Sequence, residues 1–289
     1  MSGPIPEWIV TALAAVTVFT VMFGLGLRLT LAELRWIWQR PGPMGRGLFT
    51  VLIAVPALAL VITRALELPR LAAIGIVLMA ISPGAPVALR RSLGAGGHRA
   101  FAPSLQICVA ILAVVSMPLL IAALNHVYAG HATVAPWLVA RQVFVAQLLP
   151  LGLGMALRYA SASMAARLEP GLGRAGTVLL VVLAVLALID VWEETVGAGV
   201  RVAGAIALTT GAALAVGHLL GGPEPATRTA VAITSAARNP GLALLVATLN
   251  AAAPEIKATV LAYLVVSVFA IVPYVVWRRH AGGRIGSSG

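Results

Sequence analysis

Of the 289 residues, 60% are apolar and only 10% are charged, which excludes an ordinary soluble domain and indicates a chain that spans a membrane. The net charge of +11 would suit a nucleic-acid-binding protein, but all basic residues except Arg238 lie between the apolar runs or near their ends, so membrane topology explains them and nucleic acid is excluded as a partner. The only cysteine, Cys108, lies inside an apolar run, which excludes a disulfide framework.

Apolar runs of about 20 residues, the length of a membrane-spanning helix, recur along the whole chain. They predict an all-α integral membrane protein, a single transmembrane domain over residues 1–289. We expect nine transmembrane helices: 7–28, 46–66, 70–91, 101–126, 136–158, 174–192, 197–220, 226–249 and 256–278.

Two of these runs contain residues that interrupt a helix. The third holds Ser82, Pro83 and Gly84, and the eighth holds Asn239, Pro240 and Gly241. Proline lacks the backbone donor and clashes with the preceding turn, while glycine adds backbone freedom. Irregular backbone at membrane depth must be buried in protein or line a wet cavity. We therefore predict two broken helices that cross inside the protein.

The two breaks occupy corresponding places in the two halves of the chain, which is the sequence pattern that marks a transporter's binding site. Four predicted spans precede the midpoint and five follow it. We therefore expect an inverted repeat, with residues 1–134 as the first copy, lacking its first helix, and residues 135–289 as the second.

The basic residues divide unevenly between the two membrane faces that nine spans would create. One face collects fourteen of them: Arg28, Arg35, Arg40, Arg46, Arg90, Arg91, Arg99, Arg158, Arg167, Arg174, Arg228, Arg278, Arg279 and Arg284. The other collects five: Arg64, Arg70, Arg141, Arg201 and Lys257. By the positive-inside rule the C-terminus is cytoplasmic and the N-terminus lies outside, in what we expect to be a bacterial inner membrane.

All nine carboxylates are expected in loops or at helix ends. They are Glu7, Glu33, Glu67, Glu169, Asp190, Glu193, Glu194, Glu224 and Glu255. No acid near the bilayer centre is therefore predicted to bind sodium or relay protons, and no cofactor or metal site is expected, although backbone carbonyls at the breaks leave weak cation binding open. The spans contain no paired acids and no nucleophile with a base, which argues against an enzyme and against any catalytic residue.

Arg238, beside the second break, belongs to neither membrane face. A charge at this depth needs a partner or water, and no acid is predicted nearby. Two interpretations stay open. Arg238 either binds a substrate anion or serves as a tethered cation, or it only bonds carbonyl groups and holds the crossing together. A guanidinium beside a helix N-terminus suits a carboxylate, sulfonate or phosphate.

The other polar side chains near the predicted crossing are Thr234, Ser235, Asn239 and Ser82. Each is a candidate ligand contact, and each can equally satisfy freed backbone groups. Thr17 and Thr20 on the first span are further candidates, although a threonine in a helix commonly bonds to its own preceding turn.

Several short motifs follow one another along the chain in a recognisable order: Phe23-Gly24-Leu25-Gly26-Leu27, Ser82-Pro83-Gly84, Met117-Pro118-Leu119-Leu120, Leu148-Leu149-Pro150-Leu151-Gly152-Leu153-Gly154 and Asn239-Pro240-Gly241-Leu242-Ala243. With them the chain resembles the bile acid:sodium symporter family over nearly its whole length. The resemblance implies a core domain (spans two to four and seven to nine) with two crossing broken helices. A panel domain (spans one, five and six) would rock against this core.

The resemblance also implies transport of organic anions such as bile acids, other carboxylates or sulfonates, usually coupled to sodium. The family pattern places Ser and Asn five and six residues after the first break proline, where this chain has Ala88 and Leu89. It places Glu and Gln where this chain has Thr234 and Arg238. The sodium ligands of the family are thus replaced, one of them by a permanent positive charge.

Three functions remain open at this stage. The first is a secondary carrier (a symporter by family) that moves a small organic anion across the bilayer by alternating access. The second is an uncoupled uniporter or channel, and the third is a non-transporting membrane sensor. No protein partner is evident from the sequence.

Overall fold

The computed structural model describes residues 6–30, 32–33, 36, 39–128, 135–190 and 199–285, and these residues form helices and connecting loops without strands. Eight helical stretches among them are long and apolar enough to cross a membrane: Trp8–Gly26, Pro41–Ala65, Phe101–Val127, Pro136–Ala160, Ala162–Leu186, Gly199–Leu220, Pro225–Leu249 and Pro254–Ala281. The sequence predicted nine. The remaining predicted span, 70–91, is one of the two predicted broken helices, and it consists of two short helices.

The first half of the chain begins with α1 (Glu7–Gly26). The next span combines α3 (Pro41–Phe49), the π-helix η1 (Thr50–Ala54) and α4 (Val55–Ala65). It is followed by α5 (Arg70–Ala80), α6 (Pro86–Gly94) and the long helix α7 (Phe101–Val127).

The second half begins with a span made of α8 (Pro136–Val143), the π-helix η2 (Phe144–Leu148) and α9 (Leu149–Ala160). The later helices are α10 (Ala162–Asp190), α12 (Gly199–Leu220), α13 (Pro225–Ala236), α14 (Pro240–Leu249) and α15 (Pro254–Ile285). Helix α10 begins twelve residues before the predicted span 174–192. The expected connector before that span is therefore part of the helix, and Glu169 lies within it and not in a loop.

Both predicted breaks are present. Helix α5 ends at Ala80 and α6 begins at Pro86, which leaves the first break at 81–85; α13 ends at Ala236 and α14 begins at Pro240, which leaves the second break at 237–239. Each following half-helix has proline at its first position, where the missing N–H would have no helical partner. Gly84 has φ of +86°, a conformation that favours glycine, and this explains why the first break needs that residue.

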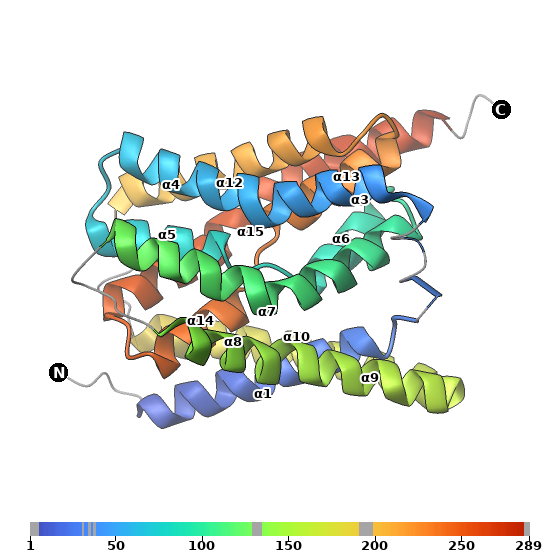
Figure 1. Cartoon of the computed structure of the whole chain (residues 1–289), viewed down its shortest axis with the longest axis horizontal. Coiled ribbons are helices and arrows are strands. Elements are labelled where there is room, and N and C mark those ends of the chain that lie inside the picture. The colour runs from blue at the N-terminus through green and yellow to red at the C-terminus, as the bar shows by residue number, and fades with distance from the viewer. Residues whose placement is uncertain are drawn as a thin grey trace.

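The helices form two layers, seen edge-on in Figure 1. We call α1, α8–η2–α9 and α10 the three-span layer; it runs along the lower side of the view, and α1 packs against both α9 and α10. The main layer contains the remaining helices, with α12 packed on α13, α15 and α4. Helix α14 of the second break packs against α1 and so joins the two layers. The inverted repeat and the division into core and panel stay predictions.

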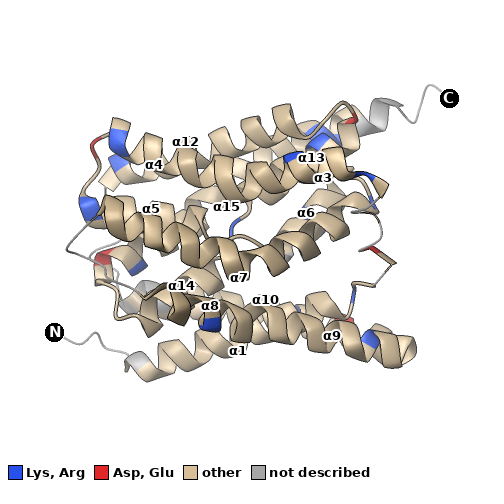
Figure 2. Ribbon diagram, viewed as in Figure 1, with Lys and Arg blue, Asp and Glu red and all other residues tan. Residues whose placement is uncertain are grey.

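Charged residues concentrate at the two ends of the helices in Figure 2, and most of the length between the ends is uncharged. At one end the Nε of Arg279 donates to the carbonyl of Gly94 (3.0 Å), and Nη2 of Arg278 donates to the carbonyl of Pro225 (3.1 Å). These bonds join α15 to α6 and α13. We call this end, which also holds Arg28, Arg90 and Arg158, the arginine-rich end.

Two of the sequence motifs meet inside the three-span layer. A Cβ placed on Gly154 of α9 would lie 2.3 Å from the carbonyl oxygen of Phe23 and 2.9 Å from the Cα of Gly26 in α1. A Cβ on Gly26 would likewise lie 2.3 Å from the carbonyl oxygen of Leu151. The two glycines therefore let the helix backbones touch, as small residues do between membrane helices.

We expect Gly154→Ala to destabilise the protein by about 1–3 kcal/mol, because the added methyl group forces α1 and α9 apart. Thermal unfolding in detergent measures the loss. Gly152→Ala is the matched control, since a Cβ at Gly152 meets nothing within 4 Å and alanine favours the helix. Equal unfolding temperatures for the two variants would contradict the close packing.

Candidate functional site

The two breaks touch each other. The backbone N–H of Asn239 in the second break donates to the carbonyl of Ser82 in the first break, at 3.0 Å. Both residues are buried. Because each break frees backbone groups from their helices, a hydrogen bond between the breaks satisfies one donor and one acceptor together.

Side chains hold the backbone on either side of this bond. The Oδ1 of Asn239 accepts from the N–H of Leu242 (3.1 Å), so Asn239 caps the first turn of α14. In the first break, Nε2 of Gln106 on α7 donates to the carbonyl of Ala85 (3.3 Å), and the hydroxyl of Ser82 donates back to Leu78 (2.7 Å). The breaks are thus fixed by specific bonds to their surroundings.

A cavity of about 510 Å³ lies beside the crossing, between the two layers. Its walls are mostly apolar side chains of α1, α10 and α15. The polar residues that line it are Thr17, Arg91, Thr177, Arg238, Asn239 and Ser267. No carboxylate is among the described residues that line it. A cavity of this size with few polar groups is typical of a site for a small organic molecule.

Part of the cavity wall is positively charged. Ala85 and Val87, at the start of α6, and Asn239, Pro240 and Gly241, around the start of α14, contribute to its wall. A helix start carries free N–H groups and the positive end of the helix dipole. Two such starts together with two guanidinium groups favour a negatively charged ligand.

Arg238 is 4% exposed, and both of its terminal nitrogens donate to the carbonyl of Val51 in η1, each at 3.1 Å. The helix itself offers this carbonyl no donor. The N–H of Val55 bonds to Thr50 in the π-helix, and the following residue, Pro56, has no N–H. Pro56, which lies in a different span from Arg238, thus leaves free the carbonyl that accepts from the guanidinium.

The guanidinium of Arg238 keeps unused binding capacity. It has five N–H groups, and its Nε makes no hydrogen bond with a described residue. Among the described residues it also makes no ion pair. A buried charge of this kind is costly unless water or an anion compensates it, and the adjoining cavity has room for either.

The structure separates the predicted site residues into two groups. Four line the cavity: Arg238, Asn239, Pro240 and Gly241. Ser82, Pro83 and Gly84 build the first break behind the cavity wall, and Thr234 and Ser235 are buried in the last turn of α13. Ser235 is the odd member, because its hydroxyl has no hydrogen-bond partner among the described residues.

Thr17 both bonds to its own preceding turn and lines the cavity. Its hydroxyl donates to the carbonyl of Leu13 (2.6 Å), and the residue also lines the cavity. Thr20 is not among the lining residues. The hydroxyl of Thr177 bonds in the same way to Gly173 (2.9 Å).

Sequence reasoning missed Arg91, Thr177 and Ser267 as lining residues. Arg91 was counted only as a topology signal, because a basic residue at the end of a predicted span usually marks a membrane face. The packed structure brings Arg91 to the cavity. No spacing in the sequence identifies Thr177 or Ser267.

We expect Arg238→Met to destabilise the protein by about 1–3 kcal/mol, because the Val51 carbonyl loses its donor. In a Pro56→Ala background the new N–H at position 56 can bond to that carbonyl, so the loss should shrink. Thermal unfolding of the four proteins of this double-mutant cycle measures the difference. The same loss in both backgrounds would mean that Arg238 is held by something other than this carbonyl.

Comparison with known proteins identifies the family of the chain. The family model of the Sodium Bile acid symporter family matches residues 15–198, a stretch that includes the first break and ends before the second. No curated protein matches the chain. Members of this family are membrane transporters and not enzymes. Since the match covers more than half of the chain and the described residues supply membrane-spanning helices, the chain belongs to the sodium bile acid symporter family.

Proposed function

We propose that this protein is a secondary carrier that moves a small organic anion across the membrane by alternating access. The observation that supports this most directly is the cavity beside the crossed breaks. Its walls are mostly apolar, Arg238 lies beside the start of α14, and Arg91 contributes a second positive charge from the last turn of α6. A ligand that matches both features has an apolar body and one anionic group.

The anionic group is a carboxylate or a sulfonate, on a bile-acid-like molecule or a smaller metabolite. A guanidinium binds such groups through two parallel hydrogen bonds. Arg238 and Arg91 each contribute a guanidinium group to the cavity wall. Asn239 also lines this wall, and its buried Nδ2 group has no hydrogen-bond partner among the described residues. A cavity of about 510 Å³ suits a ligand of metabolite size or larger.

Sodium coupling fits this chain poorly. Sodium is a hard cation that needs several oxygen ligands. The positions assigned to these ligands by the family resemblance hold Ala88 and Leu89, which have no side-chain oxygen, and Arg238, which repels a cation. We propose that the fixed charge of Arg238 acts in place of the sodium ion, either by binding the anion itself or by compensating its charge.

The alternating movement would take place between the two layers. The three-span layer would be the predicted panel and the main layer the predicted core, and the inverted repeats over 1–134 and 135–289 would each contribute spans to both. The cavity lies between them, so a rocking movement would open it to either side. The arginine-rich end would face the cytoplasm of a bacterial cell, with the C-terminus inside and the N-terminus outside.

One observation favours a second function, an uncoupled uniporter or channel. No described residue that lines the cavity carries a carboxylate that would couple transport to a cation. A uniporter would use the same substrate site and the same conformational cycle without a coupled ion, whereas a channel would need no such cycle. Nothing observed here favours a sensor.

We expect purified protein in proteoliposomes to take up labelled cholate or taurocholate equally well in sodium and in potassium. The reason is that Arg238 supplies the positive charge that a coupled ion would otherwise bring. Uptake that depends steeply on sodium would contradict the proposal. Faster uptake into vesicles preloaded with unlabelled anion distinguishes a carrier from a channel.

Arg238→Gln should lower anion uptake on the order of tenfold or more, because one charged hydrogen-bond donor is lost from the site. Arg238→Lys keeps the charge but not the planar fork. Uptake that survives in the lysine variant indicates a tethered cation, and uptake lost in both variants indicates direct binding of the anion. Unchanged uptake in Arg238→Gln, with reduced thermal stability, would assign the residue a structural role only.

A further inference from the structure

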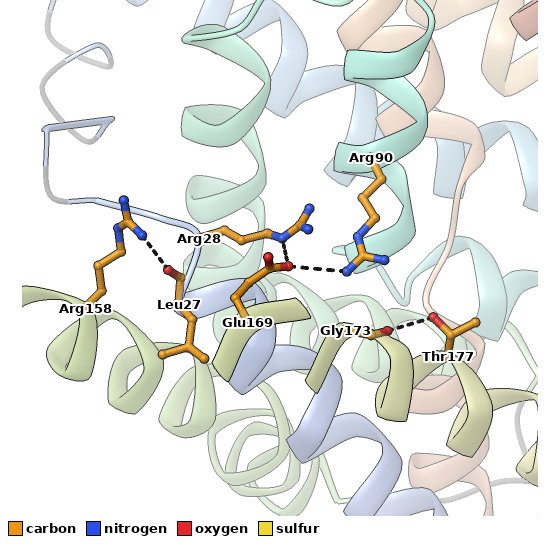
Figure 3. Close-up of polar contacts among 7 residues, drawn as sticks. All are labelled: Leu27, Arg28, Arg90, Arg158, Glu169, Gly173 and Thr177. Carbon is orange, nitrogen blue, oxygen red and sulfur yellow. Dashed lines mark hydrogen bonds and ion pairs between the residues drawn. The ribbon is translucent and has the colours of Figure 1, made fainter. Parts of the chain in front are cut away.

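A cluster of charged residues lies at the arginine-rich end, outside the site at the crossing (Figure 3). The carboxylate of Glu169 on α10 accepts a hydrogen bond from Nε of Arg28, just after α1, and lies 3.5 Å from Nη2 of Arg90 on α6. The side chain of Glu169 is 17% exposed, whereas those of Arg28 and Arg90 are 34% and 46% exposed. One carboxylate therefore lies between two guanidinium groups.

The positive charge in this cluster exceeds the negative charge. Figure 3 also shows Arg158 of α9, whose Nη1 donates to the carbonyl of Leu27 (3.1 Å) and not to a carboxylate. Glu169 is the only acid among the described residues in these contacts. Without its carboxylate, Arg28 and Arg90 would form an empty site for an anion.

The cluster adjoins the large cavity through a smaller one. A small cavity of about 70 Å³ is lined by Arg28, Arg90 and Gly173. It shares four lining residues with the large cavity at the crossing: Val21, Val87, Thr177 and Leu180. An anion that leaves the crossing toward the arginine-rich end therefore passes the two guanidinium groups.

The packing around Arg90 is specific. A Cβ on Gly173 would lie 2.2 Å from Nη2 of Arg90, so the guanidinium lies directly against the backbone of α10. Arg90 belongs to the main layer, and Glu169 and Gly173 belong to the three-span layer. The contact between Glu169 and Arg90 thus bridges the two layers at this end.

We propose that Arg28 and Arg90 form a second anion subsite on the transport path, which the Glu169 carboxylate occupies as a tethered stand-in for the substrate. The carboxylate or sulfonate of the substrate takes the place of Glu169 on the two guanidinium groups, which breaks the direct contact between Glu169 and Arg90 that bridges the layers. The two guanidinium groups are partly exposed, so an incoming anion can reach them and compete with Glu169 for them. This proposal rests on the proposed transport of an organic anion.

Thiol labelling tests the subsite directly. In a Cys108→Ser background, Val87→Cys places a single thiol between the two cavities. Two membrane-impermeant methanethiosulfonate reagents are compared from the arginine-rich side, one with a sulfonate and one with a trimethylammonium group. The ratio of their labelling rates reports how strongly the path favours an anion.

We expect Glu169→Gln to raise the rate with the sulfonate reagent about threefold to fivefold, and to raise it more than the rate with the cationic reagent, because the tethered competitor is gone. Arg90→Gln should lower the ratio of the two rates. Cholate should protect the thiol at a lower concentration in Glu169→Gln than in the parent. An unchanged ratio in Glu169→Gln or in Arg90→Gln would overturn the proposal.

Glu224→Gln is the matched control. Glu224 lies at the same end and pairs with His98 (3.8 Å) within the main layer, so its loss should leave the ratio unchanged. A shift as large as that of Glu169→Gln would overturn the proposal. If Glu169→Gln does not fold, Arg28→Gln and Arg90→Gln test the subsite independently. The labelling needs no transport, so absence of anion uptake would refute the proposed function separately.

Discussion

The hydrogen bond from the N–H of Asn239 to the carbonyl of Ser82 is the constraint on which the rest of the structure depends. Two helices that stop in the middle of a membrane protein leave backbone groups that lipid cannot satisfy. Placing the two breaks against each other solves this problem for both. It also brings two helix starts together, and so creates the electropositive end of the cavity before any side chain is considered.

Arg238 shows how one interruption of a helix is used to satisfy another. Pro56 leaves the carbonyl of Val51 without a helical donor, and the guanidinium beside the second break takes that place. The bond ties the α3–η1–α4 span to the crossing. It also fixes the charge at the cavity, so the structural and the ligand-binding interpretations of Arg238 are compatible with each other.

The contacts within the three-span layer differ in kind from the contact between the two layers. Within the three-span layer, Gly26 and Gly154 bring α1 and α9 into backbone contact, which favours movement of these helices as one unit. Between the layers at the arginine-rich end, the side chains of Glu169 and Arg90 make a contact that is partly exposed to solvent. Close packing inside a layer and a weak polar contact between layers are the physical conditions for one layer to move against the other.

The sequence by itself determined the membrane class, the all-helical fold and both breaks, because apolar run length and the Pro-Gly pairs act locally. It also placed Arg238 and Asn239 beside the second break. It put Glu169 outside the spans, whereas α10 extends over this residue, since helix length beyond the apolar run depends on packing. Only the tertiary structure decided that Ser82 and Asn239 bond, that Pro56 supplies the acceptor for Arg238, and that Arg91 reaches the cavity. These contacts join residues far apart in the chain, and no periodicity in the sequence records which helix faces meet.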